Sequence, residues 1–151
     1  MLDERYDHLA DNKAVGHYYV KEVQQGGRFE LINDFVAEDF VSHTYTGSDR
    51  RMGREHIQPS LEALHRAFPD LEVDIQLELA GEDETVTRLK MFRGTHDGEW
   101  LGVAPTGRKV AFPVMDIIQY RQRLVKAHWA VVGELQLLRQ IGATGLKGLW
   151  S

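Results

Sequence analysis

Apolar residues recur at helical spacing in the first half of the chain. Residues 12–25 place four such side chains on one helix face: Val15, Tyr18, Tyr19 and Val23. Gly26-Gly27 end this pattern. A second helix is predicted for residues 29–36 and a third for residues 57–68. Between these two helices, residues 39–53 read as an irregular loop.

From Leu71 onwards the apolar period changes from 3.6 to 2, which is typical of strands. Alternating residues predict strands over 71–79, 85–95, 110–120 and 124–132, with a turn at 81–84. Helices that precede an antiparallel meander predict the α+β class, with a curved sheet closing over the helices.

One strand carries a charge on an otherwise apolar face. The residues on that face are Val110, Phe112, Val114, Asp116, Ile118 and Tyr120. A carboxylate among apolar side chains is costly unless it is paired, and burial raises its pKa, which suits a general acid or base. The alternative is a structural aspartate bonded to a backbone amide or to an arginine.

The face to which Asp116 belongs depends on the hairpin that follows, because one residue of slip turns every side chain over. A three-residue turn over 122–124 places Asp116 on the same side as His128 and Ala130. A two-residue turn places it beside Trp129 instead. We prefer the three-residue turn, because it creates an Asp–His pair on one concave surface.

Composition narrows the class of protein. The 151 residues suit one domain, with a core over about 12–142 and a C-terminal tail over 143–151. There is no cysteine, so disulfides and thiolate chemistry are excluded. The net charge of −5 disfavours nucleic acid as a partner. No signal peptide or membrane span is recognised, so we expect a cytoplasmic protein that does not bind membranes.

Seven histidines are spread along the chain without the spacing of a metal site. Four of them are expected at the surface or at the edge of the core: His8, His17, His56 and His65. The other three lie at loop or strand positions, where residues lining a pocket occur: His43, His96 and His128. Hydrogen-bonded structural histidines remain the alternative for these three.

Short motifs in a fixed order point to a known family. They are Asp39-Phe40-Val41 with His43, Phe68-Pro69-Asp70-Leu71, Gly94-Thr95-His96-Asp97-Gly98-Glu99, Gly102, Pro105-Thr106-Gly107-Arg108, His128-Trp129 and Leu138-Arg139-Gln140-Ile141-Gly142. With these motifs, the chain resembles the SnoaL-like polyketide cyclases of the nuclear-transport-factor-2-like superfamily. The resemblance implies a cone-shaped α+β fold, commonly dimeric, with a ligand pocket between the helices and the concave sheet.

The sequence departs from this family at the positions that carry its chemistry. Ring cyclases of the anthracycline type have an acid/base aspartate where this chain has Ala130. Their supporting histidine, glutamine and asparagine align with Asp116, Val114 and Ser42, and many relatives have an aspartate at Gly133. A carboxylate has therefore moved across the hairpin to Asp116, if the register is as expected.

We expect a small-molecule enzyme that cyclises or isomerises a hydrophobic, carbonyl-bearing substrate by acid–base chemistry, without a metal or tightly bound cofactor. Asp116 is the expected acid or base, with His128 and His43 as partners. His96 is expected at the pocket rim. The other residues expected to contact the ligand are Ser42, Tyr45, Trp100, Phe112, Val114, Ile118 and Ala130.

Three other functions remain open at this point. They are a non-catalytic ligand-binding protein, an oxygenating or hydrolytic enzyme on the same fold, and an interaction module that uses the convex face of the sheet. A homodimer is also expected, because the second face of the strand over 110–120 is apolar at Ala111, Met115 and Ile117.

Overall fold

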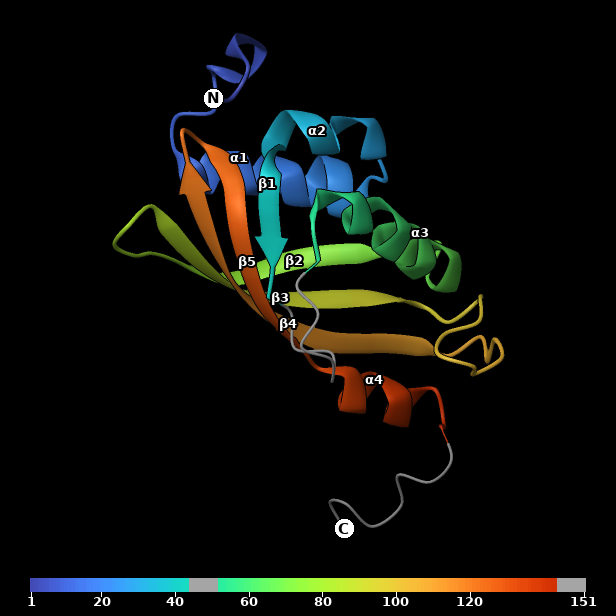
Figure 1. Ribbon diagram of the computed structural model, residues 1–151. Helices are drawn as coiled ribbons and strands as arrows, with labels where there is room; N and C mark the ends of the chain where they lie inside the picture. Colours follow the sequence, from blue (N-terminus) through green and yellow to red (C-terminus); the bar gives the residue numbers. More distant parts are fainter. Residues whose placement is uncertain (44–51, 144–151) are drawn as a thin grey trace.

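A layer of helices lies over one face of a curved five-stranded sheet (Figure 1). The computed structural model describes residues 1–43 and 52–143. The strands are β1 (Val36–Ser42), β2 (Glu72–Ala80), β3 (Thr85–Thr95), β4 (Lys109–Arg121) and β5 (Leu124–Val132). The α-helices are α1 (Asn12–Tyr19), α2 (Ile32–Phe35), α3 (Ile57–Ala67) and α4 (Glu134–Gln140). The predicted α+β class with a curved sheet is confirmed.

The first predicted helix is present, but it changes its winding. Asp11 caps α1 by accepting a hydrogen bond from the backbone N–H of Ala14, at 2.8 Å. The last six residues, Val20–Gln25, are π-helical. Gly27 then adopts a φ of 72°, which a glycine tolerates at low cost, and the helical segment ends. Val15 and Val23 are fully buried beneath this segment.

The second predicted helix is present and ends within one residue of the prediction, whereas the loop predicted over residues 39–53 begins within a strand. After a short 3-10 turn (Phe29–Leu31), α2 ends at Phe35, and Val36 opens strand β1. β1 runs parallel to β5 at the edge of the sheet, with Ser42 opposite His128. The register shifts between Val36 and Val41, so buried positions in β1 follow no period of two and the sequence hides the strand.

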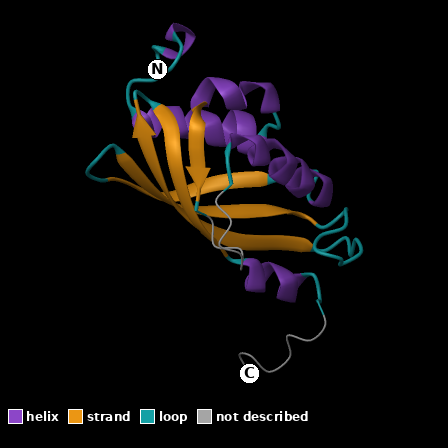
Figure 2. Cartoon of the chain, viewed as in Figure 1, coloured by secondary structure: helices purple, strands orange, loops and turns teal. Residues whose placement is uncertain are grey.

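The other four strands form the predicted antiparallel meander, in the order β5-β4-β3-β2. The predicted apolar face of β4 turns inward, and Val110, Phe112, Val114, Asp116 and Tyr120 on it are buried. Figure 2 shows helices α1, α2 and α3 gathered over the sheet, with α4 apart from them below the strands and hairpins projecting at either end.

A β-bulge interrupts the regular alternation of β2. Ile75 pairs with Lys90 and Leu77 with Leu89, which leaves Gln76 as an extra residue. Beyond the bulge, Glu78 lies opposite Arg88 and faces inward, while Leu77 is 52% exposed on the outer face. The single apolar stripe that the sequence indicated along β2 is therefore split between the two faces.

The hairpin between β4 and β5 also differs from the prediction. Its turn has two residues, Gln122 and Arg123, with φ of 51° and 63°. The expected three-residue turn is therefore wrong. Tyr120 pairs with Val125 and Gln119 with Ala127, so Lys126 is a bulge within β5.

This bulge restores the arrangement for which the longer turn was chosen. Asp116 lies directly opposite Ala130, and His128 lies opposite Ile118. The pairing places Asp116, His128 and Ala130 on the same, inner face, as expected. The prediction of the face is right although the reason for it is wrong.

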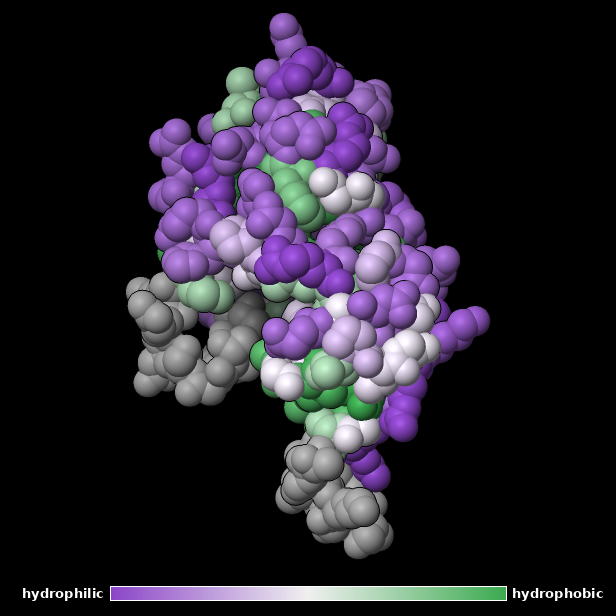
Figure 3. Space-filling view, turned by 90° about the vertical axis from the view of Figure 1, so that its right-hand side faces the viewer, coloured by the Kyte–Doolittle hydropathy of each residue, from purple (hydrophilic) through white to green (hydrophobic). Residues whose placement is uncertain are grey.

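Helix α4 was not foreseen from the sequence, and it packs against β4. The side-chain amide of Gln140 accepts a hydrogen bond from the backbone N–H of Ala111 and donates one to its carbonyl, both at 2.7 Å. Figure 3 shows a mainly polar surface, with apolar side chains gathered at the height where Figure 1 shows α4. Of the predicted tail, residues 144–151 lie outside the described residues.

No helix in the described part of the chain combines the length and the apolar character that crossing a lipid bilayer requires.

Deleting Lys126 should remove the bulge and keep Asp116 opposite Ala130, because Val125 and Ala127 already pair with the consecutive residues Tyr120 and Gln119. We therefore expect a loss of less than about 2 kcal/mol in the free energy of unfolding, measured by denaturant titration. Lys126→Ala is the matched control, because it keeps the bulge and loses only the exposed ion pair with Asp39. A deletion variant that is much less stable than Lys126→Ala would contradict the assigned register, because deleting a regularly paired residue would turn the rest of β5 over.

Candidate functional site

A cavity of about 630 Å³ lies between the helices and the inner face of the sheet. Its wall is mostly apolar, with residues from α1, the π-helical segment, α3 and strands β1, β3, β4 and β5. The polar residues in this wall that matter for chemistry are Gln24, Ser42, Arg88, Lys90, Asp116, Tyr120 and His128. A volume of this size accepts a drug-sized organic molecule.

Asp116 is the centre of one polar cluster in this wall. Its Oδ2 atom lies 2.7 Å from the ammonium Nζ of Lys90 and 3.5 Å from Nε2 of His128. Lys90 also donates to Oε1 of Gln24, at 3.1 Å. The Asp116 and Lys90 side chains are almost fully buried, whereas a quarter of the His128 side chain is exposed.

The electrostatics of Asp116 oppose the pKa expected from burial alone. Burial raises the pKa of this carboxyl group, but the ammonium of Lys90 and the ring of His128 outweigh that effect and lower the pKa to about 2. Asp116 is therefore ionised at neutral pH and is a weak proton acceptor there.

A second buried cluster surrounds Arg88. Its Nε donates to Oε2 of Glu78 at 2.6 Å, and its Nη2 donates to the hydroxyl of Tyr120 at 3.4 Å. Oε1 of Glu78 lies 3.1 Å from Nε2 of His17, an exposed residue of α1. Burial raises the pKa of the Tyr120 hydroxyl, so this group is neutral at physiological pH.

Gly16 of α1 provides the space for this cluster. A Cβ atom at position 16 would lie 1.7 Å from Nη2 of Arg88 and 2.7 Å from the Tyr120 hydroxyl. Only glycine at this position lets the guanidinium group fit between α1 and the sheet.

The structure brings together most of the residues that the sequence proposed for the site. The predicted residues that line the cavity are Ser42, Trp100, Phe112, Val114, Asp116, Ile118, His128 and Ala130. Tyr45 lies outside the described residues.

Two of the predicted histidines do not line this cavity. The ring of His43 stacks on Trp129, with centroids 4.9 Å apart. His96 is fully buried, and its Nδ1 lies 3.0 Å from the hydroxyl of Thr106. Its backbone also accepts hydrogen bonds from the N–H groups of Thr106 and Gly107, so His96 shapes the loop between β3 and β4.

Sequence reasoning missed the two cations in the wall. The sequence pattern assigns no role to Arg88 and Lys90 within the strand over 85–95, and charged side chains usually face solvent. The available signal was their position at a period of two between Val86 and Phe92, which are both buried. A face that begins and ends with apolar residues is expected to be buried along its whole length.

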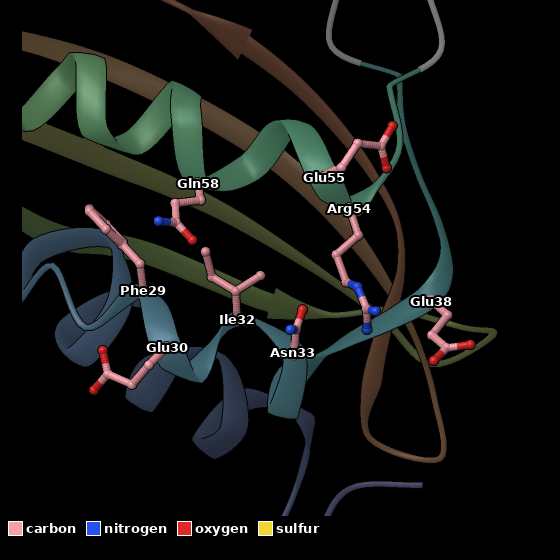
Figure 4. Close-up of a pocket in the computed structure, with 8 residues that line it drawn as sticks. All are labelled: Phe29, Glu30, Ile32, Asn33, Glu38, Arg54, Glu55 and Gln58. Carbon is pink, nitrogen blue, oxygen red and sulfur yellow. The ribbon is translucent and has the colours of Figure 1, made fainter.

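A second hollow, of about 380 Å³, lies on the outside between α2, β1 and the start of α3 (Figure 4). Its residues are mainly charged or polar, and the close-up shows the carboxylates of Glu30, Glu38 and Glu55 spread apart. Arg54 donates to the backbone carbonyl of Val36, at 3.0 Å. Among the described residues, no group of three or more His, Asp or Glu side chains is arranged to hold a metal ion.

The sequence model of the SnoaL-like polyketide cyclases matches residues 17–141 of the chain. No curated protein matches the chain. Many solved structures are similar to it in fold, three of them being AclR, IdmH and a protein from Jannaschia sp. CCS1. AclR, a candidate hydroxylase from Streptomyces galilaeus, is 26% identical with a TM-score of 0.78, and the match covers 89% of this chain and 82% of AclR.

The other two structures are less than 25% identical and show the fold alone. IdmH, a candidate polyketide cyclase from Streptomyces antibioticus, is 22% identical with a TM-score of 0.77, and the match covers 87% of this chain and 98% of IdmH. A candidate SnoaL-like polyketide cyclase from Jannaschia sp. CCS1 is 22% identical with a TM-score of 0.76, and the match covers 87% of this chain and 92% of that protein.

The low pKa of Asp116 predicts a specific loss of stability in acid. Because the folded state lowers this pKa from 3.8 to about 2, the stability that Asp116 contributes is complete above about pH 4 and is lost as the pH falls toward 2. Compared with the double variant Lys90→Met/Asp116→Asn, the wild type should lose about 2 kcal/mol more between pH 5 and pH 2.

The measurement is the free energy of unfolding in denaturant at each pH. Asp7→Asn, which removes an exposed carboxylate, serves as the control and should follow the wild type. A constant difference between the wild type and the double variant would show that Asp116 is not paired as described.

Proposed function

Because the chain belongs to the SnoaL-like polyketide cyclase family, we propose that it is a small-molecule enzyme that works by acid–base chemistry. The reaction class is cyclisation or isomerisation through transfer of a proton next to a carbonyl group. The observation that carries this proposal is an Asp–His pair, Asp116 and His128, in the wall of a largely apolar cavity.

His128 is the proposed proton-transferring group, which changes the role first expected of Asp116. Nε2 of His128 faces the Asp116 carboxylate at 3.5 Å, so Nδ1 is the ring nitrogen left to exchange a proton with a substrate. An ionised Asp116 holds the ring in this orientation. Lys90 keeps Asp116 ionised.

A hydrophobic, polyketide-like substrate suits the rest of the wall. Phe92, Phe112, Val114 and Ile118 present an apolar surface to it. Burial of a flat apolar molecule supplies binding free energy, and general acid–base catalysis then contributes a factor of about 10²–10⁴ in rate.

Two other functions compete with this proposal. A ligand-binding protein would have its polar wall groups satisfied by one another, as Lys90 is by Asp116 and Gln24. A hydroxylase is favoured by the 26% identity to AclR, which is described as a candidate hydroxylase. Consumption of O₂ that depends on the substrate would support hydroxylation and count against simple proton transfer.

Proton transfer next to a carbonyl can be measured without the natural substrate. In D₂O, the wild type should accelerate deuterium exchange at the α-carbon of 2-tetralone, followed by proton NMR. His128→Asn should reduce the accelerated rate by at least about 10²-fold, since the exchanging group is removed. Asp116→Asn should also slow exchange, because the imidazole loses its carboxylate partner.

The matched control is His8→Asn, which removes an exposed histidine of the N-terminal arm and should exchange at the wild-type rate. Wild-type exchange by His128→Asn would refute the acid–base assignment. Binding of the ketone without any acceleration by the wild type would favour the ligand-binding alternative.

The outer face of the sheet carries a continuous apolar row. Leu77, Leu89, Met115 and Val131 are successive cross-strand partners from β2 to β5. Leu77, Met115 and Val131 are each more than half exposed. A row of this kind across four strands is the surface that oligomers bury, and it supports the homodimer expected from the sequence.

Met115→Glu places a charge in the middle of this row and should convert the dimer into a monomer, because a buried unpaired carboxylate opposes association. Size-exclusion chromatography with light scattering measures the mass at micromolar concentration. Lys109→Glu, at the exposed start of β4, makes a charge change away from the row and should leave the dimer intact. A monomeric wild type would refute the proposal.

A further inference from the structure

Arg88 has hydrogen-bonding capacity that the protein does not use. Its side chain is fully buried, and Nε and Nη2 are bonded to Glu78 and Tyr120. Its Nη1 is buried and has no hydrogen-bond partner within residues 1–43 and 52–143. A buried donor on a charged group is costly to leave without a partner, so its retention calls for an explanation.

Lys90, the second cation of the wall, has no side-chain nitrogen without a partner. Its ammonium group contacts a carboxylate at 2.7 Å and an amide oxygen at 3.1 Å. Arg88 has a single carboxylate partner, Glu78, whose other oxygen faces His17. Arg88 is therefore the cation of the cavity wall that can accept a further anionic partner.

The position of Arg88 is fixed tightly enough to select a ligand. Gly16 leaves the guanidinium group space against α1, and the contact with Glu78 holds it from the side of β2. A planar guanidinium group held in this way matches the geometry of a carboxylate.

We propose that Arg88 binds an anionic oxygen of the substrate, a carboxylate or an enolate, at the end of the cavity next to α1. This inference rests on the proposed function in one respect, namely that the substrate occupies this cavity. It narrows the substrate class from hydrophobic carbonyl compounds to those that carry or develop such an oxygen. It also makes Arg88 a residue that determines specificity.

Two matched probes test the proposal by isothermal titration calorimetry. Naphthalene-2-carboxylate carries the anionic group, and naphthalene-2-carboxamide is its neutral analogue of the same shape. The wild type should bind the carboxylate at least about tenfold more tightly than the amide, since hydrogen bonds between charged partners are the stronger ones.

Two variants change this preference in opposite directions. Glu78→Gln removes the competing carboxylate and leaves Arg88 without a counter-charge, so the preference for the carboxylate probe should increase severalfold. The double variant Glu78→Gln/Arg88→Met removes both charges, which avoids a lone buried carboxylate, and should bind the two probes equally. Arg121→Met, which removes an exposed arginine, is the control and should keep the wild-type preference.

The outcomes separate this inference from the proposed reaction. A carboxylate preference that persists in the double variant overturns the role of Arg88, and so does a wild type that binds neither probe or binds both equally. His128→Asn should keep the probe preference while losing proton exchange. If exchange fails in the wild type but the Arg88-dependent preference is found, the reaction is wrong and the binding site stands.

Discussion

The neutralisation of two cations on the inner face of β3 governs the architecture of this protein. Arg88 and Lys90 point into an apolar interior, where an unpaired charge would cost several kcal/mol. Each cation has a carboxylate from a neighbouring strand, Glu78 from β2 and Asp116 from β4. Such pairs add little net stability compared with apolar residues, so their presence points to a requirement of the site.

The irregularities of the sheet supply these partners. If Gln76 paired regularly with Leu89, Leu77 would lie opposite Arg88, Glu78 would face outward and Arg88 would have no counter-charge. If Lys126 paired regularly with Gln119, His128 would lie opposite Ile117 and face away from Asp116. Each bulge therefore directs one polar side chain to the inner face. Bulges are commonly found next to functional sites, where they change the direction of a side chain in this way.

Much of the fold could be predicted from the sequence, because long antiparallel strands show their period directly. The ends of β3, β4 and β5 lie within one residue of the prediction. The pattern could not reveal β1, where the register shifts, or the bulges at Gln76 and Lys126, since an inserted residue leaves no mark of its own. The lone Asp116 indicated the candidate site, whereas Arg88 and Lys90, of which Lys90 helps to lower the pKa of Asp116, were not expected in its wall because charged side chains usually face water.

The register also relates Asp116 to the position at which relatives have their carboxylate. By resemblance, ring cyclases of this family have their acid/base aspartate at the position of Ala130, and Ala130 is the direct cross-strand partner of Asp116. Side chains at directly paired positions start about 5 Å apart on the same face, so a carboxylate at either position reaches the same part of the cavity. The small side chain of Ala130 leaves room for that carboxylate beside His128. The exchange changes the environment of this carboxylate, because at position 116 it meets Lys90 and remains ionised, which is why the proposed function assigns proton transfer to the histidine.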